Sequence, residues 1–209
     1  MSRSQNPMTG HMTGSMANFT TYVNHGQNVI ASKAFNKKDA NTVSQIAQRA
    51  SFKLMAKGYR SFGGLLRKNF TDKPETESAY NVFMRINLPE AIDKTSEVPV
   101  IDYSKLQVSQ GGLPQVQVIS AVAGAAGITL SYKTNTGIAD VSASDQVVAF
   151  GKTLEGELII ARQARGSEAI GTILIPYPGI TAAELACCYL LVMSEDGKQV
   201  SNSTFVTVV

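Results

Sequence analysis

The second half of the chain alternates short apolar stretches with tight turns and carries no helical period. Residues such as Ile128, Leu130 and Tyr132 alternate with smaller or polar ones, which is typical of a strand with one buried face. Turn sequences rich in Gly, Asn and Asp separate the stretches, and Asp196-Gly197 is a strong hairpin signal. We predict strands at Lys105–Ser109, Gln115–Ala121, Ile128–Lys133, Gln146–Gly151, Glu157–Gln163, Ala169–Ile175, Leu185–Ser194 and Gln199–Val208.

Short strands at this density, without helices between them, predict a β-sandwich of the immunoglobulin or fibronectin type III kind. Alternation within the strands predicts which apolar side chains form its core. These are Ile128, Leu130, Ile159, Leu174, Leu190 and Val192.

The first half carries different signals. Asn18–Val23 and Gln27–Lys33 flank Asn24-His25-Gly26, which predicts a β-hairpin. A period of three to four then predicts helices at about 42–57 and 59–69, broken at Gly58 and at the following glycine pair. A third helix is expected from 75 to 88, stopped by Pro89.

These signals predict an α+β protein in three parts. Residues 1–17 form an extended arm, residues 18–98 a hairpin with a helical docking region, and residues 99–209 the sandwich. The boundary is placed at Val98-Pro99, because proline and the residue before it interrupt regular structure and the composition changes there.

Positive charge is concentrated in the first third of the chain. Residues 1–71 hold ten Lys and Arg against the single acid Asp39, or 10 − 1 = +9, whereas residues 101–209 hold six bases and nine acids, or −3. Helical spacing predicts one basic stripe, formed by Arg49, Lys53, Lys57 and Arg60. Three interpretations stay open: a solvated helix face, a face that docks on an acidic protein surface, and a phosphate-binding face. We find no module that reads nucleic-acid bases.

The N-terminal segment carries methionines among small polar residues and cannot build a core of its own. Met8, Met12 and Met16, with Phe19 at the start of the hairpin, are the expected partner-binding side chains, because methionine adapts to irregular grooves. Such an arm is expected to order on neighbouring subunits, at an entropic cost. An expression-tag remnant is the alternative, which the repeated Met-Thr-Gly sequence disfavours.

No catalytic, metal or cofactor site is expected. His11 and His25 lie in the arm and in the hairpin turn, with no partner for catalysis or metal binding. Adjacent Cys187 and Cys188 would form only a strained disulfide, so free thiols and folding in a reducing cytoplasm are expected. The glycine-rich turns lack the following Lys-Ser/Thr or helix of a phosphate loop. We also expect neither a signal peptide nor a membrane-spanning helix.

Three motifs, in order along the chain, resemble those of one protein family. They are Thr42-Val-Ser-Gln-Ile-Ala-Gln-Arg-Ala-Ser-Phe52, then Ile101-Asp-Tyr-Ser-Lys105 with Gln107-Val-Ser-Gln-Gly-Gly-Leu-Pro114, and finally Ser194-Glu-Asp-Gly-Lys-Gln-Val-Ser-Asn-Ser203. The chain, from about residue 14 to its end, resembles a family of unknown function from Bacteroidota and their phages, including crAss-like phages. Members often carry a tryptophan in the N-terminal hairpin, and this chain has no Trp. The resemblance implies no catalytic residues, but favours a phage structural protein.

The sequence therefore predicts a non-enzymatic virion protein, made in the bacterial host cytoplasm and present in several copies. An auxiliary or decoration protein that docks on the major capsid protein through its N-terminal region is the leading hypothesis. A host-encoded adhesion or carbohydrate-binding module is an alternative, which would call for exposed aromatic platforms, and a nucleic-acid-packaging protein is another.

Overall fold

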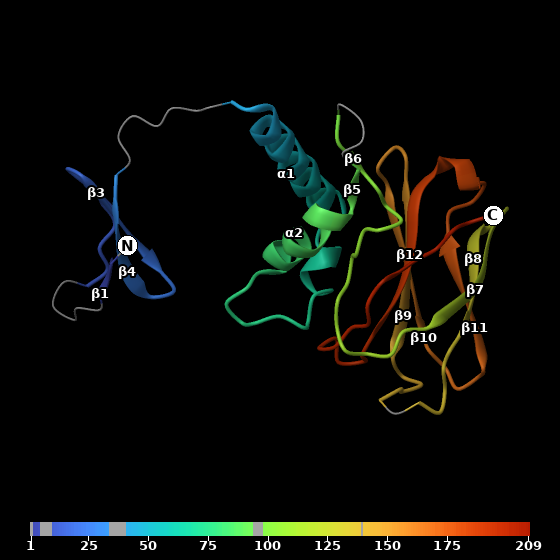
Figure 1. Cartoon of the computed structure of the whole chain (residues 1–209). Helices are drawn as coiled ribbons and strands as arrows, with labels where there is room; N and C mark the ends of the chain where they lie inside the picture. The colour runs from blue at the N-terminus through green and yellow to red at the C-terminus, as the bar shows by residue number, and fades with distance from the viewer. Residues whose placement is uncertain (1, 5–9, 34–40, 94–97, 139) are drawn as a thin grey trace. The chain divides into compact units, whose positions relative to one another are not determined.

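The computed structural model describes residues 2–4, 10–33, 41–93, 98–138 and 140–209. The chain divides into two compact units, Met1–Thr42 and Val43–Val209 (Figure 1). The predicted boundary at Val98-Pro99 therefore does not separate compact units. Helices and sandwich belong to the same unit.

The first unit is a small antiparallel sheet in the order β1-β4-β3-β2. Its strands are β1 (Ser2–Ser4), β2 (Gly14–Met16), β3 (Phe19–Asn24) and β4 (Gln27–Ser32). The predicted hairpin is confirmed: Asn24 pairs with Gln27, and His25 and Gly26 turn the chain with φ of 49° and 75°. Two consecutive positive φ values match the tight turn that suits the twist of paired strands.

The predicted extended arm of residues 1–17 is corrected where the structure describes it. Residues 2–4 pair with β4 and residues 14–16 pair with β3, so both add strands to the hairpin instead of standing free. Segment 10–12 is also held, because the Met12 N–H donates to Asn28 Oδ1 at 3.0 Å and Asn28 Nδ2 donates to the Gly10 carbonyl at 2.6 Å. Backbone groups left open at the hairpin edges are the physical reason for this pairing.

The second unit consists of a helical layer and two antiparallel sheets. Its helical segments are α1 (Val43–Ser61), η1 (Leu65–Arg67), α2 (Ala79–Glu90) and η2 (Ala182–Glu184). One sheet has the order β10-β9-β12-β13, formed by Leu158–Ala164, Gln146–Thr153, Leu185–Met193 and Thr204–Phe205. The other has the order β11-β8-β7, formed by Ile170–Pro176, Gly127–Lys133 and Gln117–Gly124. A two-stranded ladder joins β5 (Ile92–Asp93) to β6 (Val100–Ile101).

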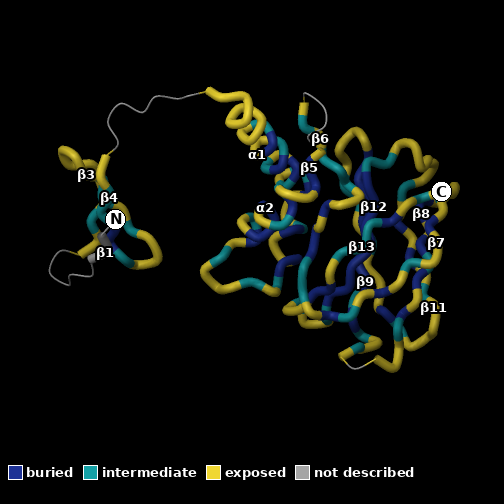
Figure 2. Tube along the Cα trace, viewed as in Figure 1, coloured by how far each residue is buried: buried dark blue, intermediate teal, exposed yellow. Residues whose placement is uncertain are grey.

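The sheet that contains β9 and β12 is the middle layer (Figures 1 and 2). Val148 and Phe150 of β9 pack in a cluster with residues of α1 and α2, whereas Val147 and Ala149 pack in a second cluster with residues of β8 and β11. Both faces of the central strands are therefore buried, and the helices complete a core that the sequence analysis had assigned to the sandwich alone. The observed architecture is α+β and sandwich-like.

Two helix boundaries differ from the prediction. Gly58 does not break α1 but lies buried within it, where an added Cβ would come within 2.9 Å of Ile101 Cδ1. This glycine therefore allows close approach to β6 instead of ending the helix. Helix α2 begins at Ala79, behind Ser78, whose hydroxyl accepts the Asn81 N–H at 3.2 Å, and it continues through Pro89 to Glu90.

The predicted strands are confirmed at β7 to β12 with shifts of a few residues, and two predictions differ. Residues 105–109 form no strand, and the expected strand Gln199–Val208 is reduced to β13. The core prediction holds for Ile128, Leu130, Leu190 and Val192, which are buried, and Ile159 packs against the same cluster. It is wrong for Leu174, which is 43% exposed, because Ile173 and Ile175 on either side point inward.

Candidate functional site

The predicted basic stripe lies on the exposed side of α1. Arg49, Lys53, Lys57 and Arg60 are all solvent-exposed and follow the helix at spacings of four, four and three. Side chains at these spacings share one helix face. The structure therefore places these four predicted site residues on one surface.

Apolar side chains are exposed on the first half of the same helix. Every residue from Val43 to Arg49 is exposed, and Figure 2 shows these turns projecting from the buried part of the unit. Val43 is 84% exposed, Ile46 54% and Phe52 47%. Val43 and Ile46, three residues apart, share one side of the helix, whereas Phe52 comes nine residues after Val43 and lies on the opposite side. Helices in proteins owe most of their stability to a packed apolar face, so the exposed Val43 and Ile46 make this end of α1 suited to a partner.

The second half of α1 is anchored. Ser51, Met55 and Gly58 are buried on its inner face, and Phe62 just beyond the helix packs edge-on against Phe150 and Tyr189 of the central sheet. The exposed first half thus extends from a rigid base.

A cavity of about 190 Å³ lies at this anchored half. Leu54, Lys57, Gly58, Ser61, Ile101, Tyr103 and Lys152 line it. Lys152 comes from β9 and is only 7% exposed. Its Nζ donates to Ser61 Oγ at 2.6 Å, and the Ser61 hydroxyl in turn donates to the Gly58 carbonyl at 2.7 Å.

Aromatic rings provide the rest of the surroundings of Lys152. Its Nζ lies 5.1 Å from the centre of the Phe62 ring and 6.0 Å from that of Tyr103, distances at which ring faces attract cations. Burial lowers the pKa of the Lys152 ammonium; Cys187 acts in the opposite direction, and the positive charge of Lys57 adds to the effect of burial. Lys152 and Lys57 make the cavity electropositive, since no acidic residue is among the described residues that line it.

Lys152 was not among the site residues predicted from the sequence. The sequence did contain a signal, because Lys152 closely follows the apolar run Val147–Phe150. A lysine in a strand that is covered on both faces is buried. Its neighbours in the cavity, Ser61 and Tyr103, lie 91 and 49 positions earlier in the chain (152 − 61 and 152 − 103), so no local pattern pointed to them.

The predicted N-terminal site residues fall in the other compact unit. Met16 and Phe19 are cross-strand partners on β2 and β3, and both are exposed. Met12 is half-buried, beside Asn28. Met8 lies outside the described residues.

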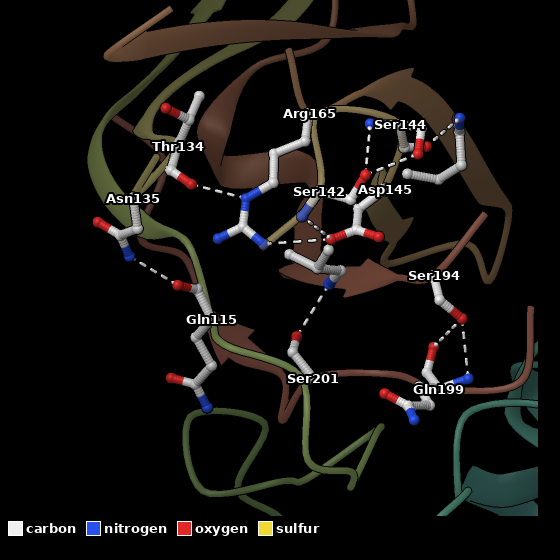
Figure 3. Close-up of polar contacts among 12 residues, drawn as sticks. Gln115, Thr134, Asn135, Ser142, Ser144, Asp145, Arg165, Ser194, Gln199 and Ser201 are labelled. Atoms are coloured by element: carbon white, nitrogen blue, oxygen red, sulfur yellow. Dashed lines mark hydrogen bonds and ion pairs between the residues drawn. The ribbon is translucent and has the colours of Figure 1, made fainter. Parts of the chain in front are cut away.

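A second polar cluster lies in the sandwich, at the loops that follow β8 and β10 (Figure 3). The side chain of Arg165 is fully buried, its Nε donates to the Thr134 carbonyl at 2.6 Å, and its Nη1 lies 3.6 Å from Asp145 Oδ2. Asp145 Oδ2 also accepts the Ser142 N–H at 3.1 Å. These contacts tie together loops distant in sequence, which indicates a structural role.

The two cysteine thiols are buried and weakly acidic. Burial raises the pKa of both Cys187 and Cys188 to about 12, which keeps the thiols neutral. His11 and His25 are exposed. Among the described residues we find no cluster of three or more His, Cys, Asp or Glu side chains that could hold a metal ion. Within the same part of the chain, no helix has both the length and the apolar character needed to cross a membrane.

A family model described as a family of unknown function matches residues 11–207. No curated protein and no solved structure matches the chain.

Proposed function

The chain belongs to DUF6266, a family of unknown function, and we propose that it is a non-enzymatic structural protein of a phage virion. In this proposal it is an auxiliary or decoration protein that docks on another virion protein, most simply the major capsid protein. It is made in the bacterial cytoplasm and is present in several copies per particle.

One observation carries the proposal: the first half of α1 combines exposed apolar side chains with a basic stripe. Val43 and Ile46 offer apolar area, and Arg49 and Lys53 follow Ile46 on the same side of the helix, at spacings of three and four. A buried apolar centre with a charged rim is the usual composition of protein interfaces. An acidic partner surface complements this charge and would speed the encounter.

The sequence motifs that resemble a family of Bacteroidota and their phages support the virion assignment. In the same proposal the sandwich is of the immunoglobulin or fibronectin type III kind and acts as a rigid body that α1 anchors to the particle. The exposed pair Met16 and Phe19 on the N-terminal sheet adds a second, weaker contact. Two modest contacts on one chain raise overall avidity.

Particle incorporation tests the proposal. The double variant Arg49→Glu, Lys53→Glu should be lost from purified particles, while its circular dichroism spectrum and melting temperature stay those of the wild-type chain. Lys133→Glu, Arg162→Glu is the matched control, because it makes the same charge change at exposed positions of the sandwich. It should be incorporated normally.

Two results would overturn the proposal. Absence of the wild-type chain from particles would exclude a virion role. Normal incorporation of the helix variant, equal to that of the control, would indicate that the basic stripe is only a solvated helix face.

Binding to DNA tests the packaging alternative. Salt-dependent binding of the wild-type chain to DNA, lost in the helix variant, would support that alternative.

A further inference from the structure

The cavity beside α1 holds a buried cation, Lys152, that pairs with no acid in the part of the chain that the structure describes. Among the described residues, no Asp or Glu forms an ion pair with Lys152 or with Lys57, and no acidic residue lines the cavity. Buried charges in proteins are normally paired, since removing an ion from water costs several kcal/mol.

The contacts that Lys152 does make leave donors unused. An ammonium has three N–H donors, and the described residues accept one of them, at Ser61 Oγ. The two aromatic rings stabilise the charge but accept no conventional hydrogen bond. The cavity thus presents a cation with spare donors to whatever enters it.

We propose that this cavity binds a carboxylate, supplied by an Asp or Glu side chain of the protein that docks on α1. The proposal rests on the docking function above and names the chemistry that the site recognises. Lys152 pairs with the carboxylate from inside, and Lys57 pairs with it from the rim. Charge-assisted hydrogen bonds of this kind are among the strongest in proteins.

The walls favour a carboxylate on an alkyl stem over a phosphate. Leu54, Ile101 and Tyr103 line the cavity with apolar atoms, which suit the methylene groups of an acidic side chain. A phosphate presents more acceptor oxygens, and the described residues that line the cavity include no arginine to pair with them.

The position of the cavity links it to the exposed helix surface. Lys57 belongs both to the basic stripe and to the cavity rim. Leu54 also lines the cavity, and it lies on one helix face with Ala50, Ala47 and Val43, at spacings of four, three and four. A partner segment that covers this face from Val43 onward therefore reaches the cavity.

Acetate tests the carboxylate site directly in the intact chain. With lysine labelled at ¹³Cε, acetate titrated against sodium chloride of equal ionic strength should shift the Lys152 and Lys57 resonances in a saturable way. The response should disappear in Lys152→Met, which keeps the length and bulk of the side chain. It should persist in Lys53→Met, which removes a stripe lysine that does not line the cavity.

Three results would overturn the carboxylate site. They are equal shifts with chloride and acetate, an unchanged acetate response in Lys152→Met, and saturation by inorganic phosphate at lower concentration than by acetate. The last result would make the cavity a phosphate site.

Retention of the chain on purified particles distinguishes failure of the carboxylate site from failure of the docking function. Lys152→Met should be retained about tenfold or more weakly than the wild-type chain, the expected effect of one lost charged hydrogen bond. Wild-type retention of Lys152→Met would overturn the partner carboxylate and leave docking through α1 standing. Absence of the wild-type chain from particles would overturn docking, while acetate binding would still report the cavity's chemistry.

Discussion

Cys187 and Cys188 are neighbours in the chain but pack into two different hydrophobic cores. Cys187 lies in the cluster that joins the helices to the central sheet, and Cys188 lies in the cluster between the two sheets. Successive strand residues point to opposite faces, so this pair marks a strand that is covered on both sides. The whole strand shares this property, since Tyr189 and Leu191 follow Cys187, whereas Leu190 and Val192 follow Cys188.

Both thiols should be almost unreactive in the native protein. Burial raises the pKa of each to about 12 from an ordinary value near 9, so the thiolate fraction at pH 8 falls by about 1,000-fold. Labelling with a chromogenic disulfide reagent should be slow in buffer and rapid for both thiols in denaturant. Rapid native labelling would contradict the two-core packing.

The same raised pKa values predict a loss of stability at alkaline pH. The unfolded chain releases these protons near pH 9, whereas the folded chain retains them to about pH 12. The stabilisation from neutral thiols is therefore full below pH 9 and lost progressively between pH 9 and about pH 12. Denaturant unfolding of the wild-type chain and of Cys187→Ala, Cys188→Ala should converge over that interval.

Alanine substitutions should distinguish Leu190, which the structure buries, from Leu174, which it exposes. The sequence predicted that both side chains lie in the core. Leu190 is buried, so Leu190→Ala should lower the free energy of unfolding by about 2–5 kcal/mol. Leu174 is exposed, and Leu174→Ala should change it by no more than about 0.5 kcal/mol. Urea unfolding measures both. A large loss at Leu174 would indicate that the strand faces the other way.

The fragment 43–209 should fold cooperatively, and the fragment 99–209 should not. The boundary predicted at Val98-Pro99 would make residues 99–209 a separate part, but removing α1 and α2 would uncover Phe150, Tyr189 and Leu191 on the central sheet. Circular dichroism and thermal unfolding of the two fragments check this. A sharp melting transition for 99–209 would show that the helices are dispensable for the core.

Asp145→Asn should destabilise the sandwich strongly. The change keeps the side-chain size but leaves the buried Arg165 guanidinium without its charged partner, for an expected cost of about 3–5 kcal/mol. Arg165→Met in the same chain should recover part of that loss, because the unpaired charge is then gone. Arg162→Ala, an exposed neighbour on β10, is the control. A cost below about 1 kcal/mol for Asp145→Asn would argue against a tight ion pair.

Local patterns along the chain determined where strands form and where the chain turns. The hairpin at Asn24–Gln27 and the strands β7 to β12 follow from alternation and turn residues, which depend on neighbours only a few positions away. The basic stripe of α1 follows from helical spacing in the same way. The continuous apolar run Leu185–Met193 is typical of a strand buried on both faces, a signal that the sandwich prediction did not take into account.

Tertiary structure decided what covers each face and which distant residues meet. No local period specifies that α1 and α2 lie on the central sheet, or that Ile173 and Ile175 rather than Leu174 point inward. The Lys152 cavity and the Arg165–Asp145 pair likewise join residues far apart in the chain. Such contacts arise when separate elements bury their apolar faces together, so their positions depend on the packing of the whole unit and not on neighbouring residues.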